Sequence, residues 1–254
     1  MKTNHQFHFA PIPDNLRQAL TRLMTDGVPP EAVQIYRGAR NTLYELTIEG
    51  ERLCVKHFRR AKFPNNFIYT NFRASKARRS FDHANRLLSM GFDTPQPIAY
   101  GENKRGLRLV DSYYICRYVD IANIRGWAER SDSAALIKAL AAEMARLHDA
   151  GVLNKDFSPG NILAQPTADG RYLFFYVDLN RMRFDVRDRA KLMTMFRSIS
   201  LDADDTRRLA EAYAEATGLD TEPVVDKALA LLNHYHAVKR RHRFFKRLIH
   251  RGRK

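Results

Sequence analysis

Cysteine is rare in this sequence, and long apolar segments are missing from it. The 254 residues include two cysteines, Cys54 and Cys116, which provide neither a disulfide framework nor a zinc site. Both lie in strand-like segments, where a free cysteine usually behaves as a small buried hydrophobic residue. No apolar run is long enough to span a bilayer, and residues 1–12 lack the apolar core of a signal peptide. We therefore expect a protein of the reducing cytoplasm.

Acidic residues are scarce relative to basic ones. The chain carries 43 Lys and Arg against 28 Asp and Glu, which gives a formal net charge of +15 and a pI near 10. A surplus of this size favours anionic partners, such as nucleotides, nucleic acids or anionic lipids. The length suits one large domain or two lobes around a shared cleft.

The most specific chemistry is carried by two segments, Leu153–Leu163 and Phe174–Arg181. Asp156 lies five residues before Asn161 in the first segment, and Asp178 ends the apolar run of the second. Hard cations such as Mg²⁺ take carboxylate and amide oxygens as ligands. This spacing matches the catalytic loop of kinases, where the first Asp accepts the proton of the acceptor hydroxyl and the other two residues hold Mg²⁺. We assign Asp156 as the catalytic residue, with Asn161 and Asp178 as metal ligands.

Several positions depart from that kinase pattern. Asn154 stands where the loop usually has His, and Leu179-Asn180 follows Asp178 in place of Phe-Gly. Ser158 stands where the loop usually has a lysine. Three basic residues are candidates to replace that lysine: Lys155, Arg181 and Arg183. The alternative for the loop by itself is an Asx turn before a helix, because Asp, Ser, Pro, Gly and Asn are all turn formers.

A candidate nucleotide-binding lysine lies upstream, in the third of three strand-like segments, which span residues 33–36, 43–48 and 52–58. Lys56 follows an apolar pair, as the lysine of the Val-Ala-Ile-Lys signature does, and we assign it to the α- and β-phosphates of a nucleotide. A strand lysine that reaches out to solvent is the alternative. Gly38 is the single glycine of the turn expected to cover the phosphates, with Arg37 and Arg40 beside it.

Residues 74–119 predict the rest of the sheet, a helix and a hinge. Further strands are expected over residues 98–100, 107–110 and 113–119, which completes a five-stranded antiparallel sheet. We expect the backbone of the last residues, Arg117, Tyr118 and Val119, to pair with adenine. A kinase carries a Glu on the helix expected over 74–90, but here Asp82 is the available acid and Ser80 can occupy the Glu position instead.

Apolar residues at helical spacing predict further helices over residues 13–25, 131–150, 187–199, 204–217 and 223–238. Asp132 or Ser133 is expected to cap the helix at 131–150, and Gly151 to end it. His148, on that helix, is predicted to be structural rather than catalytic.

Two basic segments contain interleaved aromatic or apolar residues. Residues 59–79 can bind an anionic head group or nucleic acid, or form a solvated loop packed by its own aromatic side chains. Residues 237–254 place apolar residues on one side of a basic helix, which is typical of binding to an anionic membrane surface. A disordered, solvated tail is the alternative, and RNA binding ranks third.

With these segments placed, the sequence resembles the bacterial lipopolysaccharide kinase family, the Kdo and heptose kinases of the protein-kinase-like superfamily. The resemblance spans roughly residues 33–215 and is carried by Val55-Lys56, Ser75–Phe81, Gly91–Tyr100, Lys155–Leu163 and Asp178–Arg181. The Pro-Gly-Asn loop is shared with aminoglycoside and choline kinases, whereas the middle segments are more particular to the lipopolysaccharide branch.

That resemblance implies a bilobal α+β fold of the protein-kinase type, with a five-stranded small lobe and a mainly α-helical large lobe. It also implies ATP and Mg²⁺ as cofactors, and transfer to a sugar hydroxyl of the lipopolysaccharide core or a related membrane glycolipid. We expect an N-terminal lobe over 1–118 with an extra helix, a C-terminal lobe over 119–236 and a basic tail over 237–254.

We therefore predict an ATP-dependent sugar kinase, peripheral on the inner face of the inner membrane. A catalytically weak pseudokinase that binds a membrane or a protein is the main alternative, because of Asn154, the sparse glycine turn and the missing helix Glu. A kinase that acts on a soluble small molecule or a protein is the third possibility.

Overall fold

The computed structural model describes residues 3–38, 41–59, 74–106, 108–199 and 202–251, with side chains described as far as Arg241. The chain divides into two compact units. The first unit consists of Met1–Asp120 and Phe175–Asn180, and the second of Ile121–Phe174 and Arg181–Lys254.

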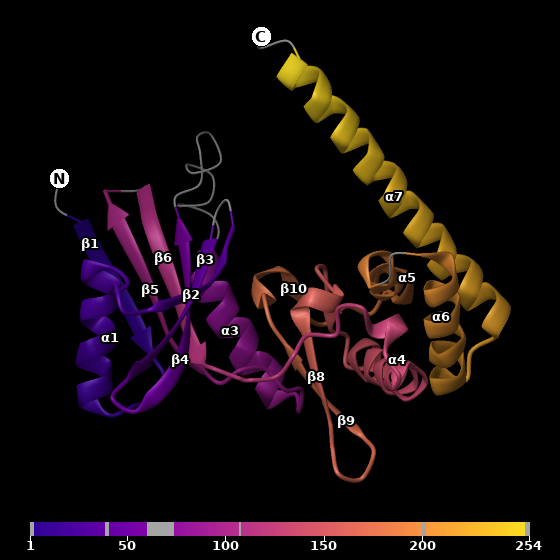
Figure 1. Ribbon diagram of the computed structural model, residues 1–254, viewed down its shortest axis with the longest axis horizontal. Helices are drawn as coiled ribbons and strands as arrows, with labels where there is room; N and C mark the ends of the chain where they lie inside the picture. The colour runs from indigo at the N-terminus through magenta and orange to yellow at the C-terminus, as the bar shows by residue number, and fades with distance from the viewer. Residues whose placement is uncertain (1–2, 39–40, 60–73, 107, 200–201, 252–254) are drawn as a thin grey trace. The chain divides into compact units, whose positions relative to one another are not determined.

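A six-stranded antiparallel sheet forms the frame of the first unit (Figure 1). In sheet order its strands are β1 (Thr3–Phe9), β5 (Pro97–Arg105), β6 (Arg108–Arg117), β4 (Glu51–Arg59), β3 (Asn41–Ile48) and β2 (Val33–Arg37). Among the described residues its helices are α1 (Asp14–Asp26) and α3 (Lys76–Ser89).

The predicted number of five strands was one too low. The additional strand is β1, which pairs with β5 along its whole length. Its sequence is mostly polar and its side chains are exposed or half-buried, so it lacks the apolar alternation from which a strand is predicted. The strands expected over 107–110 and 113–119 form the single strand β6 among the described residues.

The two helices of this unit cover opposite faces of the sheet (Figure 1). Side chains alternate between the faces along β4, because successive residues of a strand point to opposite sides. Leu53 and Val55 pack with the α1 residues of one core cluster, whereas Cys54 and Phe58 pack with the α3 residues of the other. Lys56 therefore lies on the face that α3 covers.

The second unit is mainly helical and carries two short sheets, β7 with β10 and β8 with β9. Its elements are η1 (Trp127–Glu129), α4 (Ser133–Asp149), β7 (Leu153–Asn154), η2 (Pro159–Asn161), β8 (Ile162–Pro166), β10 (Met182–Arg183), α5 (Arg189–Leu192), η4 (Met193–Ser198), α6 (Ala203–Thr217) and α7 (Thr221–Arg251). Two elements cross the boundary between the units, β9 (Tyr172–Tyr176) and η3 (Leu179–Arg181).

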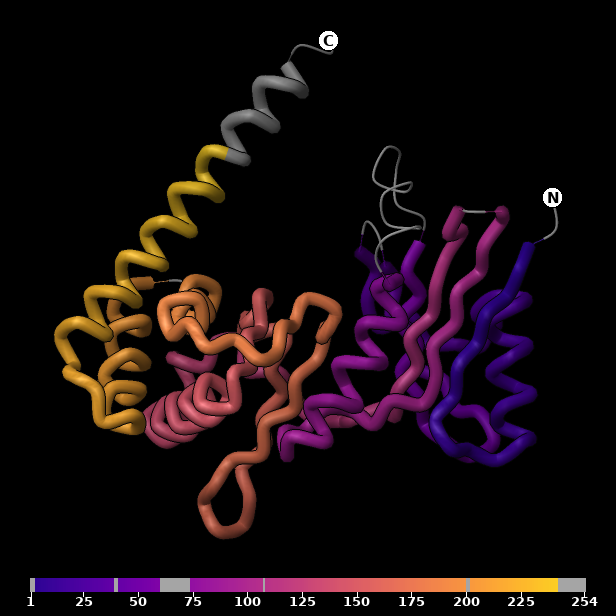
Figure 2. The backbone as a smooth tube through the Cα atoms, turned by 180° about the vertical axis from the view of Figure 1, so that it is seen from behind, coloured from indigo at the N-terminus to yellow at the C-terminus, as the bar shows by residue number. Residues whose placement is uncertain are grey.

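Helix α6 packs against α4 on one side and α7 on the other, and α7 also contacts η4 (Figure 2). The last buried residue of α7 among those whose side chains are described is Leu232, although the helix continues to Arg251. The segment predicted as a helix over 223–238 and the basic residues after it, as far as Arg251, thus belong to one continuous helix. The apolar tail residues Phe244, Phe245, Leu248 and Ile249 lie outside the described side chains, and residues 60–73 of the other basic segment lie outside the described residues.

The two ends of α4 are built differently. At its C-terminus Gly151 has φ +67°, and its N–H donates to the carbonyl of His148. Asp132 occupies the N-cap position, as predicted, but its side chain makes no capping hydrogen bond. Its carboxylate instead accepts two hydrogen bonds from Arg130 and one from Tyr172. Ser133 is the first residue of the helix and not its cap.

None of the described helices is both long enough and apolar enough to cross a membrane.

Candidate active site

In the first unit, Lys56 forms an ion pair with Asp178. Lys56 is 8% exposed, and its Nζ lies 2.6 Å from Oδ1 of Asp178 and 5.3 Å from the centre of the Phe58 ring. A buried ammonium group requires a partner because it has lost its hydration. The predicted alternative, a lysine that reaches out to solvent, is therefore wrong.

Asp178 is held in an unusual backbone conformation. Its φ of +59° lies in the left-handed region, which few residues other than glycine adopt. The side chain of Asn180 donates to Oδ1 of Asp178 at 2.5 Å and is itself buried. A strained acid fixed by two donors is typical of a functional position, because structure elsewhere must compensate for the strain.

Two contacts attach the segment Phe175–Asn180 to the first unit. The hydroxyl of Thr94 donates to the carbonyl of Tyr176 at 2.7 Å, and Nδ1 of His83 lies 2.7 Å from the carbonyl of Leu179. Burial lowers the pKa of His83, which favours a neutral ring that donates its Nδ1–H. The role of His83 was missed from the sequence. The sequence did contain one signal for it: His83 is three residues after Ser80, and residues at this spacing share one face of a helix.

Helix α3 supplies no acid to Lys56 among the described residues. Asp82 pairs with Arg78 on the exposed side of the helix at 3.5 Å. Ser80 is 1% exposed, and its hydroxyl donates to the carbonyl of Lys76 within α3. The acid that pairs with Lys56 comes instead from Asp178, more than one hundred residues further along the chain.

In the second unit, the loop after β7 is organised by its own side chains. Asn154 is 1% exposed, and its Oδ1 accepts from the backbone N–H of Asp156 at 2.9 Å. Asn161 donates from Nδ2 to the carbonyl of Asp156 at 3.0 Å. Asn154 thus fixes the start of the loop, and Asn161 fixes its end. With its amide nitrogen engaged, Asn161 has an oxygen to offer to a metal ion.

The helical part of the second unit supports this loop from behind. Arg197 donates to the carbonyl of Lys155 at 2.9 Å, and the hydroxyl of Ser198 donates to the carbonyl of Phe157 at 2.9 Å. The Phe157 side chain is fully buried. These contacts hold the backbone on both sides of Asp156, which is how a reactive side chain is kept in one orientation.

Two arginines lie beside the loop. Arg181 approaches Oδ2 of Asp156 at 3.4 Å, which makes it the structure's candidate to replace the missing lysine. The guanidinium of Arg125 packs on Gly160, where a Cβ atom would come within 2.6 Å of Nη2. Arg125 was missed from the sequence, because an exposed loop arginine carries no pattern that links it to this turn.

The hinge residues are partly engaged within the first unit. The N–H of Arg117 donates to Gln96 and that of Tyr118 to Arg52, both at 2.9 Å. The predicted pairing with adenine thus has to use other backbone groups of Arg117 and Tyr118, or those of Val119. Gly38 lies in the turn between β2 and β3, where a Cβ would come within 2.8 Å of the Asn41 side chain. Its predicted neighbour Arg40 lies outside the described residues.

The donor groups fit magnesium better than a transition metal. Asp178 offers a carboxylate and Asn161 an amide oxygen, both hard ligands. The described residues contain no cluster of three or more His, Cys, Asp or Glu that could hold a metal by themselves. Mg²⁺ commonly takes one or two protein ligands and completes its shell with water and phosphate, so it does not require a protein cluster of that size.

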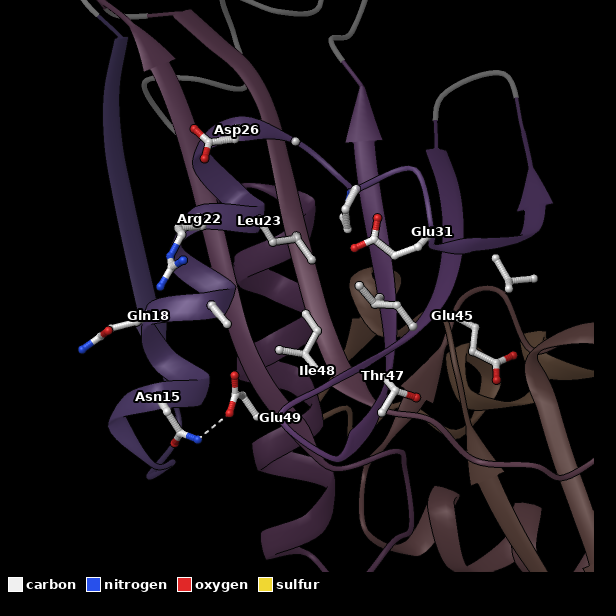
Figure 3. Close-up of a pocket in the computed structure, with 15 residues that line it drawn as sticks. Asn15, Gln18, Arg22, Leu23, Asp26, Glu31, Glu45, Thr47, Ile48 and Glu49 are labelled. Atoms are coloured by element: carbon white, nitrogen blue, oxygen red, sulfur yellow. Dashed lines mark hydrogen bonds between the residues drawn. The ribbon is translucent and has the colours of Figure 1, made fainter.

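A pocket of about 650 Å³ lies elsewhere in the first unit, between α1 and the strands β2 and β3 (Figure 3). Its lining includes the acids Asp26, Glu31, Glu45 and Glu49. It opens on the α1 face of the sheet, opposite to Lys56, and none of the predicted site residues lines it. The pocket is therefore separate from the candidate active site.

Comparisons with known proteins bear on the family and the fold of the chain. The model of the lipopolysaccharide kinase (Kdo/WaaP) family matches residues 32–213. A solved structure described as WaaP in complex with acyl carrier protein is similar, with 17% identity, a TM-score of 0.55 and coverage of 93% of this chain and 98% of that one. An aminoglycoside-3'-phosphotransferase of type VIII has 13% identity, a TM-score of 0.52 and coverage of 87% and 99%. No curated protein matches the chain.

The predicted resemblance and the predicted protein-kinase-like fold class are both confirmed. Since the family model covers well over half of the sequence, the chain belongs to the lipopolysaccharide kinase (Kdo/WaaP) family and is a phosphotransferase.

Proposed function

We propose that this protein transfers the γ-phosphoryl group of ATP to a sugar hydroxyl, Kdo or heptose, of the lipopolysaccharide core or of a related membrane glycolipid. The observation that carries the proposal is the loop around Asp156. Its backbone is fixed at both ends by Asn154 and Asn161, and its carboxylate lies beside Arg181. This arrangement presents one acid to an acceptor hydroxyl.

Asp156 acts as the general base in this proposal. A base must lie within hydrogen-bond reach of the proton that it removes, and a fixed backbone keeps Asp156 in that position. Arg181, 3.4 Å from Asp156, balances the negative charge that a phosphoryl group brings to the site. Arg125, packed on Gly160, adds a second positive charge on the same loop.

Lys56 binds the α- and β-phosphates of ATP. Phosphate oxygens would replace Asp178 as the partner of its ammonium group, so the buried charge stays compensated in both states. Asn161 and Asp178 would hold Mg²⁺, which neutralises charge on the phosphates during transfer. Most of the rate enhancement then comes from positioning and electrostatics.

The acceptor and the location follow from charge. A net charge of +15 suits an anionic glycolipid and the anionic surface that carries it. We propose that the protein works at the inner face of the inner membrane, with the basic end of α7 as its membrane contact. The division into lobes 1–118 and 119–236 with a tail 237–254 stays part of the proposal, and the tail is the segment to delete on its own.

The direct test is magnesium-dependent ATP consumption in the presence of purified lipid A–core acceptors that end in Kdo or heptose. We expect acceptor-stimulated turnover by the unmodified protein, and loss of that turnover in Asp156→Asn. Asp204→Asn, which changes an exposed carboxylate of α6 in the same way, is the matched control and should keep full activity. Equal turnover in Asp156→Asn and the control would refute the assignment of Asp156.

One observation favours the alternative, a catalytically weak pseudokinase that binds a membrane or a protein. Among the described residues no acid of α3 pairs with Lys56, so the usual device for orienting this lysine is missing. Nucleotide binding without turnover on any acceptor, including soluble small molecules and proteins, would establish that alternative.

A further inference from the structure

The two cysteines of the chain face each other across neighbouring strands of the first unit. Cys54 of β4 is directly opposite Cys116 of β6 in the antiparallel register. Directly opposed residues point to the same face of a sheet, and their Cα atoms are about 4.5–5.5 Å apart. A disulfide accepts Cα separations of about 4.4–6.8 Å, so a bond could form here without backbone movement.

The two thiols are close enough to affect each other. The Cys116 thiol donates to the carbonyl of Cys54 at 3.9 Å. The neighbouring Cys116 thiol lowers the pKa of Cys54, and the nearby Lys56 ammonium adds to the effect while burial opposes it. The neighbouring Cys54 thiol raises the pKa of Cys116 well above its usual range, and burial raises it further.

Solvent exposure, like the pKa directions, makes Cys54 the more reactive of the two thiols. Cys54 is half-buried, whereas Cys116 is buried. The thiolate is the reactive form of cysteine, so the more accessible and more acidic thiol reacts first. Cys54 thus has the properties of an attacking thiol, and Cys116 those of a resolving thiol.

The pair lies where the proposed nucleotide-binding residues are. Cys54 is two residues before Lys56 on the same strand and on the same face of the sheet. Cys116 directly precedes the hinge residue Arg117. A bound nucleotide with its phosphates at Lys56 and its base at the hinge would cover this part of the face.

We propose that Cys54 and Cys116 form a dithiol modification site that hydrogen peroxide converts to a disulfide, and that bound nucleotide shields it. The shielding rests on the proposed function, whereas the dithiol chemistry does not. Cys54 is the nucleophile, and Cys116 closes the bond between β4 and β6.

The chemistry proceeds in two steps. The Cys54 thiolate attacks one oxygen of the peroxide, the O–O bond breaks, and the departing hydroxide takes up a proton to become water. Cys54 is left as a sulfenic acid. The sulfur of Cys116 then attacks the Cys54 sulfur, the S–O bond breaks, and a second water leaves. The two thiols together lose two hydrogen atoms, and one peroxide molecule becomes two water molecules.

The first experiment measures the mass of the intact protein after peroxide treatment. Since the chain has only two cysteines, an intrachain disulfide can only be this one. We expect a product lighter by two hydrogen atoms, which a reductant reverses. Folded protein that keeps both thiols under conditions that oxidise a urea-denatured sample would overturn the proposal.

Single substitutions test the order of attack. Cys116→Ser should leave a sulfenic acid on Cys54 that dimedone traps, whereas Cys54→Ser should suppress the reaction. Cys116→Ala replaces the serine variant if a buried hydroxyl prevents folding. Trapping on Cys116 in Cys54→Ser, with none on Cys54 in the Cys116 variants, would reject the assigned roles.

The last experiment tests whether bound nucleotide protects the two cysteines, separately from whether they form a disulfide. With MgATP at about ten times its dissociation constant, the fraction of free protein falls about tenfold, so disulfide formation should slow about tenfold. A disulfide that forms at an unchanged rate, although MgATP is bound, would keep the dithiol site and refute its place at the nucleotide.

Discussion

At the scale of single residues, the candidate site contains acids and cations that depend on one another. Lys56 is buried, and Asp178 is the carboxylate that compensates it. Asp178 in turn keeps a left-handed backbone conformation, with Asn180 as a second donor to its carboxylate. A change at any of these positions therefore affects folding as well as chemistry, and the two effects have to be measured separately.

Removing the carboxylate of Asp178 should destabilise the fold. Breaking a buried ion pair costs about 3–5 kcal/mol, and the Asp178 side chain is 29% exposed, so we expect Asp178→Ala to lower the free energy of unfolding by about 2 kcal/mol. Asp178→Asn should cost less, because Asn tolerates a positive φ and keeps a hydrogen bond to Lys56. Urea denaturation measures both values. Asp82→Ala, which removes an exposed acid of α3, is the control, and a loss equal to that of Asp178→Ala would contradict the role of the pair.

A methyl group at Gly160 should displace Arg125. The Cβ of an alanine would come within 2.6 Å of the Arg125 guanidinium, which can move because its side chain is flexible. We expect Gly160→Ala and Arg125→Ala each to lower kcat/KM for the acceptor about tenfold, with little change in thermal stability.

The double variant decides whether these two changes act through one contact. If they do, Gly160→Ala combined with Arg125→Ala should be no slower than either single variant. Fully additive losses would show that Gly160 acts on something other than Arg125.

At the scale of elements, the second unit depends on the packing of α4 against α6. His148 of α4 is 3% exposed, and its Nδ1 lies 2.7 Å from the hydroxyl of Tyr213 on α6. Arg189 also donates to that hydroxyl, at 3.0 Å. Burial, with Arg189 as a second cause, lowers the pKa of His148 to about 4. The predicted structural role of His148 agrees with this buried position.

Stability should therefore depend on pH through His148. The unfolded chain takes up a proton near pH 6.5 and the folded protein only near pH 4, so the free energy of unfolding falls as the pH is lowered between these values. The contribution is at most about 3 kcal/mol. In His148→Gln, whose new side chain does not titrate, the free energy of unfolding, measured by urea denaturation, should change less with pH over this range. His234→Gln, on the exposed side of α7, should leave the profile unchanged, and an equal response of both variants would refute the assignment.

Elements with strong periodicity could be predicted from the sequence, and the rest depended on tertiary contacts. The helices α1, α3, α4 and α6 begin and end close to their predicted bounds, because apolar spacing and turn residues mark them. Strand β1 forms because β5 offers it an edge, which no local pattern reveals. The helix expected over 187–199 divides into α5 and the 3₁₀ helix η4, from which Arg197 and Ser198 reach the loop at Asp156.

The same limit applies to the candidate site. The spacing of Asp156, Asn161 and Asp178 is a sequence pattern, and their assigned roles stay predictions. The contacts of Asp178 with Lys56 and of Arg125 with Gly160 join residues far apart in the chain, so only the folded structure shows them. Asn154, a departure from the kinase pattern, has a structural explanation, since it accepts from the backbone of Asp156.

At the scale of the whole molecule, charge is concentrated at the C-terminus. Residues 237–254 contain nine of the 43 Lys and Arg and no acid, so their removal lowers the formal net charge from +15 to +6. Each basic residue near an anionic bilayer contributes about 1 kcal/mol. A chain that ends at His236 should therefore bind anionic vesicles at least about tenfold more weakly.

The truncation should leave the fold intact, because Leu232 is the last buried residue of α7 among the side chains described as far as Arg241. Vesicle co-sedimentation measures binding, neutral vesicles are the lipid control, and thermal unfolding reports on folding. Undiminished binding of the shortened chain to anionic vesicles would move the membrane contact away from this tail.

The segment Phe175–Asn180 has a consequence for how the protein can be divided. Because it belongs to the first unit while the chain on both sides of it belongs to the second, the polypeptide passes between the units three times. No single cleavage can release an intact first unit. A fragment that ends at Asp120 would lack Asp178 and leave the buried Lys56 without its carboxylate. Neither unit is a continuous segment of the chain, so the two units have to be expressed and engineered together as one polypeptide.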